Sequence, residues 1–249
     1  MLTADAELAR TLATEAGERL LAVRRDYPGD DSSELKDIGD AAAQELLAAR
    51  LAQARPGDAV LSEEAADDLG RLTADRVWII DPLDGTREFS EGRADWAVHV
   101  ALWERGALAV GAVALPGLGV VLSTHPAPVV PPAVPGAPLR LAVSRTRPPA
   151  LAVALAERLG LETVPMGSAG FKVAAVVRGD VDLYVHAGGQ YEWDSAAPVA
   201  VALAAGLHAS RIDGSALDYN QEDVLLPDLV VCRPELADQV LRTIAEVTA

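Results

Sequence analysis

The chain of 249 residues is poor in cysteine, in lysine and in long apolar runs. Its one cysteine, Cys232, excludes an internal disulfide, and its apolar neighbours predict that it is buried. No apolar stretch reaches the roughly eighteen residues that a membrane span requires, and the first residues lack the basic start of a signal peptide. We therefore expect a cytoplasmic protein with no membrane partner.

Positive charge is also scarce. The formal net charge is −16, from 21 lysines and arginines against 37 aspartates and glutamates. Such a surface repels a nucleic-acid polymer, which excludes that class of partner. Small phosphate esters remain compatible, because bound divalent cations reverse the local charge. Lysine occurs only at Lys36 and Lys172, which draws attention to both positions.

Half of the residues are hydrophobic and 23% are charged, a balance typical of a soluble globular protein. Helical spacing over 4–24 and 40–54 is followed by short strands and a meander over 96–123, so residues 1–130 form a predicted α+β domain. A proline-rich stretch then marks the boundary. Beyond it, strands and helices alternate over 139–249, which predicts an α/β domain.

The most informative segment is Trp-Ile-Ile-Asp-Pro-Leu-Asp-Gly-Thr at residues 78–86. A hydrophobic strand there delivers Asp81 and Asp84 into a tight turn, and hard oxygen ligands so close together suit a pair of divalent cations. The plainer interpretation is a hairpin turn at Asp-Gly. Pro82 argues against it, because proline cannot donate a hydrogen bond to a paired strand.

Further carboxylates elsewhere in the chain complete a candidate metal site. Glu63 follows a short strand, Asp194 follows Trp193, and Asp40 stands at the start of the second predicted helix. Each has a plainer interpretation, as a solvated acidic loop for Glu63 and as a helix N-cap for the two aspartates. Thr86 begins a helix or turn, where free backbone N–H groups favour an anion such as phosphate.

As an ordered set, these segments resemble the inositol monophosphatase superfamily of magnesium-dependent, lithium-sensitive phosphatases. The resemblance covers most of the chain and implies a layered αβαβα fold of the inositol monophosphatase and fructose-1,6-bisphosphatase type. Within the superfamily, Arg87-Glu88-Phe89 and Ser168-Ala-Gly-Phe-Lys172 are similar to the 3′-phosphoadenosine 5′-phosphate phosphatases of sulfur metabolism, called CysQ in bacteria. The actinobacterial members look most similar.

The resemblance also implies residue roles. Glu63, Asp81 and the Leu83 carbonyl would hold one Mg²⁺, and Asp81, Asp84 and Asp194 the second. Glu63 would contribute to a third, loosely held ion.

Thr86, bonded to Asp40, would orient or deprotonate the attacking water. The N–H groups of Gly85 and Thr86 would contact the phosphate. The implied substrate-binding residues are Gly85, Thr86, Ser168, Lys172 and Asp194. For Lys172 the alternative is an exposed surface lysine.

Two departures from the family pattern bear on these roles. The Lys36-Asp-Ile-Gly39 segment before Asp40 is unusual, which affects the third metal. Ala169 and Gly170 stand where the nucleotidases tend to carry serines, which affects substrate choice.

We therefore expect a magnesium-dependent phosphatase that removes the 3′-phosphate of 3′-phosphoadenosine 5′-phosphate, or of its sulfated relative 3′-phosphoadenylyl sulfate. The alternatives are an inositol-1-phosphate or fructose-1,6-bisphosphate phosphatase, and a non-catalytic regulator that binds Mg²⁺ or a nucleotide. The partner would be a small phosphorylated nucleotide or sugar, and the protein a monomer or homodimer.

Overall fold

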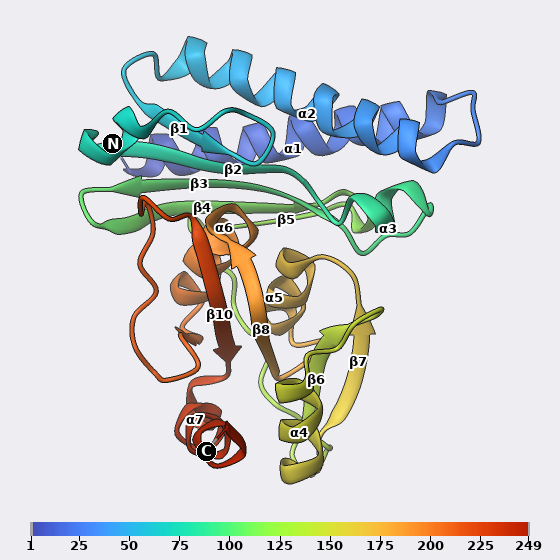
Figure 1. Ribbon diagram of the computed structural model, residues 1–249, viewed down its shortest axis with the longest axis vertical. Coiled ribbons are helices and arrows are strands. Elements are labelled where there is room, and N and C mark those ends of the chain that lie inside the picture. Colours follow the sequence, from blue (N-terminus) through green and yellow to red (C-terminus); the bar gives the residue numbers. More distant parts are fainter. Residues whose placement is uncertain (1, 249) are drawn as a thin grey trace.

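The computed structural model describes residues 2–248 and arranges them in five layers (Figure 1). Two helices cover one face of a first sheet, two more separate it from a second sheet, and a last pair covers the far face. In chain order the helices are α1 (Leu2–Asp26), α2 (Ser32–Ala54), α3 (Thr86–Ser90), α4 (Ala150–Leu159), α5 (Ala169–Arg178), α6 (Glu192–Ala204) and α7 (Ala237–Thr248). The predicted αβαβα sandwich is confirmed.

The first sheet has the order β1-β2-β3-β4-β5, with β1 and β2 parallel and the other pairs antiparallel. Its strands are β1 (Ala59–Ser62), β2 (Arg76–Asp84), β3 (Ala97–Glu104), β4 (Ala107–Leu115) and β5 (Val120–Ser123). The predicted meander is confirmed as β3 to β5.

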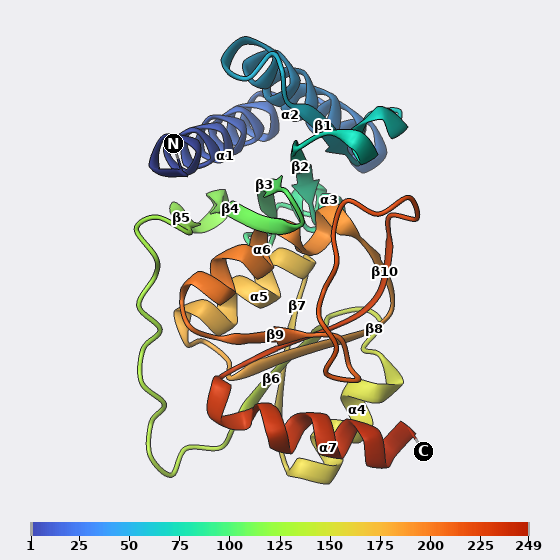
Figure 2. The same cartoon turned by 90° about the vertical axis from the view of Figure 1, so that its left-hand side faces the viewer.

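The second sheet has the order β7-β6-β8-β10-β9 and mixes parallel with antiparallel pairs. Its strands are β6 (Arg140–Ser144), β7 (Glu162–Met166), β8 (Leu183–Tyr191), β9 (His208–Ser210) and β10 (Leu225–Cys232). Short 3₁₀ turns lie at Leu69–Thr73, Pro116–Leu118 and Pro234–Leu236. Figure 2 shows the proline-rich segment running along one side of the molecule from the first sheet to the second.

Alternation along β2 explains how the first sheet is buried on both faces. Trp78 and Ile80 pack with α1 and α2, while Val77 and Ile79 face α5 and α6. The core around α5 and α6 also takes in residues of the second sheet, so it crosses from one half of the chain to the other. A third core lies between the second sheet and helices α4 and α7, and Cys232 is buried there as predicted.

Two predicted helix starts were wrong, and both concern site residues. The second helix begins at Ser32 rather than near Asp40, because Asp31 accepts hydrogen bonds from Ser33 N and Glu34 N at 2.8 and 3.4 Å and caps it. Asp40 therefore lies inside α2. Helix α6 begins at Glu192, so Asp194 is not its N-cap.

A buried arginine joins the loop that follows β1 to the second half of the chain. The side chain of Arg71 is fully buried and forms an ion pair with Asp67 at 2.7 Å. It also donates to Asn220 Oδ1 at 2.7 Å and to the Gln221 carbonyl at 2.9 Å. Glu192, at the start of α6, accepts the backbone N–H groups of these last two residues. The Glu63 side and the Asp194 side of the molecule are thereby linked.

Candidate active site

The motif of residues 78–86 ends β2 in an irregular turn. The register of β2 against β3 shifts between Asp81 and Asp84, where Pro82 interrupts the ladder. Leu83 N donates to Asp81 Oδ1 at 3.0 Å, which closes a local turn. Gly85 then adopts φ +92°, and α3 begins at Thr86. Both carboxylates are thus delivered to one end of the sheet by the local backbone.

Asp81 is almost completely buried among other acids. Only 1% of it is exposed, and its Oδ2 atom has no hydrogen-bond partner among the described residues. Burial raises the pKa of Asp81 well above its usual range, and the charges of Asp84, Glu63 and Asp194 raise it further. An orphaned carboxylate oxygen in such surroundings is expected where a cation belongs.

Asp84 is held by the start of α5. Its carboxylate accepts from Ser168 Oγ at 2.5 Å, Gly170 N at 2.6 Å and Ala169 N at 3.2 Å. These bonds join the predicted metal ligand of the first half to the predicted substrate-binding helix of the second.

Glu63, in the loop after β1, and Asp194, in the first turn of α6, both lie near the same cluster. Burial raises the pKa of each carboxyl group to about 7, and in both cases Asp84 is the next cause. Asp194 is the third residue of α6 and accepts from Tyr191 N at 2.6 Å. The structure therefore brings Glu63, Asp81, Asp84 and Asp194 together, as the sequence predicted.

Asp40 lies beside this cluster because α2 approaches α3 closely. A Cβ at Gly39 would lie 2.9 Å from Phe89 Cε1, so glycine permits the approach. Burial, followed by the charges of Glu64 and Asp37, raises the pKa of Asp40 to about 7. Among the described side-chain hydrogen bonds, none joins Asp40 to Thr86, although the sequence predicted such a pair.

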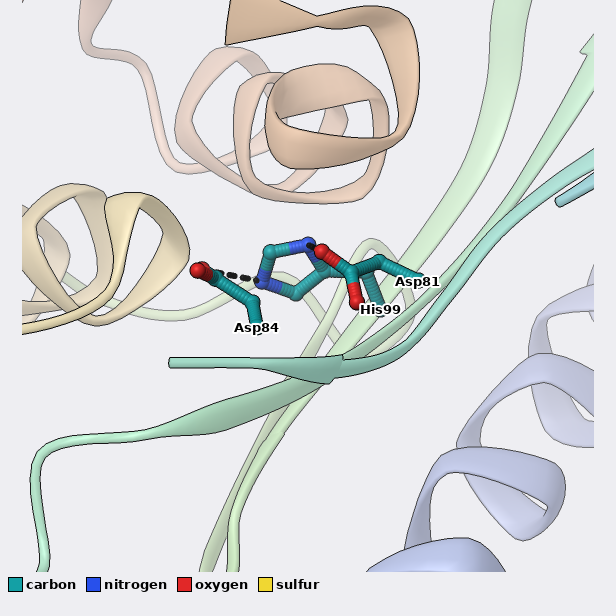
Figure 3. Close-up of side chains that lie close together, drawn as sticks. All are labelled: Asp81, Asp84 and His99. Atoms are coloured by element: carbon teal, nitrogen blue, oxygen red, sulfur yellow. Dashed lines mark ion pairs between the residues drawn. The ribbon is translucent and has the colours of Figure 1, made fainter. Parts of the chain in front are cut away.

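His99 on β3 is a site residue that sequence reasoning missed. It is fully buried, and Figure 3 shows its ring between Asp81 and Asp84. Nε2 lies 3.3 Å from Asp84 Oδ2, and Nδ1 lies 3.8 Å from Asp81 Oδ2 and 3.0 Å from the Trp193 carbonyl. Burial lowers the pKa of His99, while the charge of Asp84 opposes this shift. A single histidine in an apolar strand gives no indication in the sequence that its ring will lie between two carboxylates.

The buried ring of His99 leaves room only for glycine at position 170. A Cβ at this position would lie 1.9 Å from His99 Nε2, a distance that no side chain can adopt. At position 170 the departure from the serine pattern thus has a steric cause, because the imidazole fills the space that a side chain there would need.

Lys172 is buried, so the surface interpretation was wrong. Only 6% of it is exposed, its Nζ donates to the Gly167 and Ser168 carbonyls, and it lies 5.3 Å from the centroid of the Tyr184 ring. Burial lowers its pKa, and neighbouring carboxylates oppose the shift. The lysine therefore stabilises the turn that presents Ser168 to Asp84.

An open pocket of about 720 Å³ lies next to the cluster. It is lined by Asp84, Gly85 and Asp194, by Ser168 and Lys172 at the start of α5, by arginines near α3 and after β6, and by residues of β8. A volume of this size is typical of a small-molecule site.

The fold has two sheets in five layers, and carboxylates line the pocket between its two halves. This combination is typical of a hydrolase whose active site lies in that pocket. The chain matches the inositol monophosphatase family over residues 1–249, and it belongs to that family.

Individual relatives are consistent with this assignment. The chain is 56% identical to a 3′-phosphoadenosine 5′-phosphate phosphatase of Mycobacterium leprae, covering 98% of this chain and 94% of the relative. It is 32% identical to the 3′(2′),5′-bisphosphate nucleotidase CysQ of Escherichia coli, covering 86% and 94%. Among solved structures, CysQ from Bacteroides thetaiotaomicron matches with a TM-score of 0.80 and 26% identity over 92% and 97% of the two chains. Inositol monophosphatase II from Staphylococcus aureus matches with a TM-score of 0.81 at 20% identity over 96% and 94%, which shows the shared fold.

Among the described helices, none combines the length and apolar character needed to cross a membrane.

Proposed function

We propose that this protein is a magnesium-dependent phosphatase that hydrolyses the 3′-phosphate of 3′-phosphoadenosine 5′-phosphate. The observation that carries the proposal is the convergence of four carboxylates from both halves of the chain beside a pocket with cationic and polar walls. The 56% identity to the mycobacterial phosphatase over nearly all of both chains supports the substrate.

The donor set fits divalent cations, because Asp81 Oδ2 has no protein partner among the described residues, and because burial and then the neighbouring carboxylates raise the pKa of Asp81. Glu63, Asp81 and the Leu83 carbonyl would hold one Mg²⁺, and Asp81, Asp84 and Asp194 would hold a second. Glu63 would also contribute to a third, more weakly held ion. When bound, the metal ions supply Lewis-acid stabilisation of the phosphate and lower the pKa of water.

The protein groups perform the remaining tasks. The backbone N–H groups of Gly85 and Thr86 orient the phosphate at the start of α3. The Thr86 hydroxyl positions the attacking water. Asp40, whose pKa is raised to about 7, is poised to accept its proton near neutral pH.

On the substrate side, Ser168 and Lys172 hold the wall of the pocket beside Asp84 and Asp194. Lys172 has a third N–H group beyond the two that donate to carbonyls, and this group is available to the second phosphate of the nucleotide.

The test is a side-by-side comparison of kcat/KM for 3′-phosphoadenosine 5′-phosphate, 3′-phosphoadenylyl sulfate, inositol 1-phosphate and fructose 1,6-bisphosphate, each with Mg²⁺. We expect the bisphosphate nucleotide to give the highest value and chelation of the metal to abolish turnover. A higher value for inositol 1-phosphate or fructose 1,6-bisphosphate would assign the protein to the sugar phosphatases instead. Binding of nucleotide without turnover of any substrate would favour a regulator. The cytoplasmic location and the monomeric or dimeric state remain predictions.

A further inference from the structure

The loop that carries Glu63 has little packing of its own. It runs from the end of β1 to the 3₁₀ turn at Leu69–Thr73, and residues 64–70 are all exposed. Residues 63–68 belong to no helix or strand, so no ladder of backbone hydrogen bonds holds them. At its start the loop is anchored by Ser62, whose hydroxyl donates to Gln44 Oε1 at 2.8 Å. A loop with so few buried contacts opens at a low cost in free energy unless its far end is anchored as well.

Arg71 supplies this second anchor. Its guanidinium binds both carboxylate oxygens of Asp67, because Nε donates to Oδ1 at 2.7 Å and Nη2 donates to Oδ2 at 2.9 Å. Asp67 lies on the exposed loop, whereas the Arg71 side chain is fully buried. Two parallel bonds to a planar guanidinium fix the orientation of the loop as well as its distance, which a lysine could not do.

The same guanidinium is bonded to the second half of the chain. Nη1 donates to Asn220 Oδ1 at 2.7 Å, and Nη2 donates to the Gln221 carbonyl at 2.9 Å. Asn220 Nδ2 in turn donates to the Arg71 carbonyl at 3.2 Å. Each guanidinium nitrogen of Arg71 therefore has a protein partner, so this buried charge serves to join two segments of the chain.

Glu192 extends the connection to the predicted metal ligand Asp194. It is the first residue of α6, and only 1% of it is exposed. Its Oε2 accepts from Asn220 N at 2.6 Å, and its Oε1 accepts from Gln221 N at 2.7 Å. Asp194 lies two residues further along, in the same turn of the helix. A continuous set of bonds thus runs from the loop of Glu63 to the turn that presents Asp194.

We propose that Arg71 is a positioning residue for the metal site, which holds Glu63 at a fixed place relative to Asp194 by way of Asp67 and Glu192. The two ligands come from opposite halves of the chain, so their relative position depends on a contact between the halves. Without this contact the loop still reaches the site, but Glu63 samples more positions and binding of Mg²⁺ must order it. This inference rests on the proposed function, since it concerns the same metal site.

The decisive variant is Asp67→Asn. Its amide NH₂ group would face an N–H group of Arg71, so the paired bonds are broken, while the bonds to residues 220 and 221 remain. The thermal midpoint without metal should therefore stay within about 2 °C of wild type. With 3′-phosphoadenosine 5′-phosphate, we expect the Mg²⁺ concentration at half-maximal turnover to rise about tenfold, the low end of effects for groups that orient metal ligands, and kcat at saturating Mg²⁺ to change by less than about twofold. The rise of the thermal midpoint with Mg²⁺, measured without substrate, should move to higher concentrations by a similar factor.

The matched control is Asp68→Asn, which removes the same charge from the neighbouring position. The Asp68 side chain accepts from Gly70 N at 2.9 Å, a bond that asparagine can keep, and none of the described side-chain bonds joins it to the Arg71 guanidinium. This control should keep the Mg²⁺ dependence of wild type. Arg71→Met removes the whole network and should shift the Mg²⁺ dependence at least as far as Asp67→Asn, with a loss of stability.

Equal Mg²⁺ dependence of Asp67→Asn and Asp68→Asn would overturn the proposal. So would a folded Arg71→Met with the metal dependence of wild type, or a loss of stability in Asp67→Asn without a change in Mg²⁺ dependence, since Arg71 would then be only structural. If wild type shows the Mg²⁺-dependent rise in thermal midpoint but does not hydrolyse 3′-phosphoadenosine 5′-phosphate, the proposed function fails, while the comparison of metal binding still decides the role of Arg71.

Discussion

The first and second halves of the chain build the pocket in different ways. In the first half, Asp81 and Asp84 lie within four residues at the end of one strand, and Glu63 follows the strand paired with it. In the second half, the pocket residues are spread over the loop after β6, the start of α5, the strand β8 and the start of α6. Most of the predicted metal ligands thus come from neighbouring segments of the first half, with Asp194 as the exception, whereas the substrate wall is assembled from several distant segments.

The two halves also differ in how their charges are compensated. In the first half, burial raises the pKa of Asp81 well above its usual range, and the nearby charges of Asp84 and Glu63 add to this shift. The second half supplies much of the compensation, through the donors of α5 that bind Asp84. The site depends on this contact between halves, and the following changes test each side of it.

Removing a carboxylate from the first half should have the largest effect. Asp81→Asn keeps the acceptor for Leu83 N but removes a charge that both metals need, so kcat/KM should fall by about 10³-fold or more. Because like-charge repulsion is relieved, the free energy of unfolding without metal should hold or rise. Kinetics with Mg²⁺ and denaturant unfolding without it check the two parts.

Asp194→Asn, from the second half, should cost activity to a similar extent. Asp75→Asn, at an exposed position just before β2, is the control and should change little. Near-normal turnover of Asp81→Asn would contradict the proposed metal site.

Lys172→Ala should have the next largest effect. A charge-assisted hydrogen bond to phosphate contributes about 1.5–3 kcal/mol, so its loss should lower kcat/KM for 3′-phosphoadenosine 5′-phosphate by about ten- to a hundredfold. Inositol 1-phosphate, which has no second phosphate, should be affected much less. Lys36 is partly buried on α2 and is not among the residues that line the pocket, so Lys36→Ala, which removes the other lysine, is the control and should leave the ratio of the two substrates unchanged. Equal losses on both substrates would limit Lys172 to holding the Ser168 turn.

The contact between His99 and Gly170 should give a smaller effect, on stability. Gly170→Ala is expected to lower the free energy of unfolding by about 1–3 kcal/mol, because its Cβ would overlap the imidazole. In a His99→Ala background the same change should be nearly neutral. A double-mutant cycle with denaturant measures this coupling, and additive effects would show that the two positions do not compete for space.

The smallest expected effect is a pH dependence of the metal-free protein. The pKa of Asp194 is about 7 when folded and near 4 when unfolded, so the folded state retains a proton that the unfolded state has lost between these values. This contribution to stability is complete below about pH 4 and is lost as the pH rises through about 7. Asp194→Asn, which cannot ionise, should therefore gain about 3–5 °C in Tm relative to wild type between pH 6 and pH 8, which corresponds to about 1.4 kcal/mol.

Saturating Mg²⁺ should reverse this difference, because the metal binds the ionised carboxylate of wild type. A difference in Tm that stays constant with pH would show that Asp194 is ionised throughout in the metal-free protein.

Sequence reasoning was most accurate where a structure is set by neighbours in the chain. The strand and turn of residues 78–86 follow from an apolar run, a proline and a glycine, and the structure has them at those positions. It was wrong at helix starts, because Asp31 competes with Asp40 as a cap for the same helix and only the packing of α2 decides between them. Asp194 was misplaced by a similar ambiguity, since an acid suits both the cap and the first turn of a helix.

The sequence by itself determined the family and the set of acids at the site, because the motif of residues 78–86 and the other acidic segments are local patterns, and the resemblance that they carry implied the layered class of fold. The tertiary structure decided which groups meet those acids. His99 lies 71 residues before Gly170, and Asp84 lies 84 residues before Ser168, so no local pattern records either contact. The residues of β8 likewise join the pocket lining only after the second sheet has packed against α5 and α6. Packing brings such groups together because each half must bury its apolar face, and burial then fixes their charges and hydrogen-bond partners.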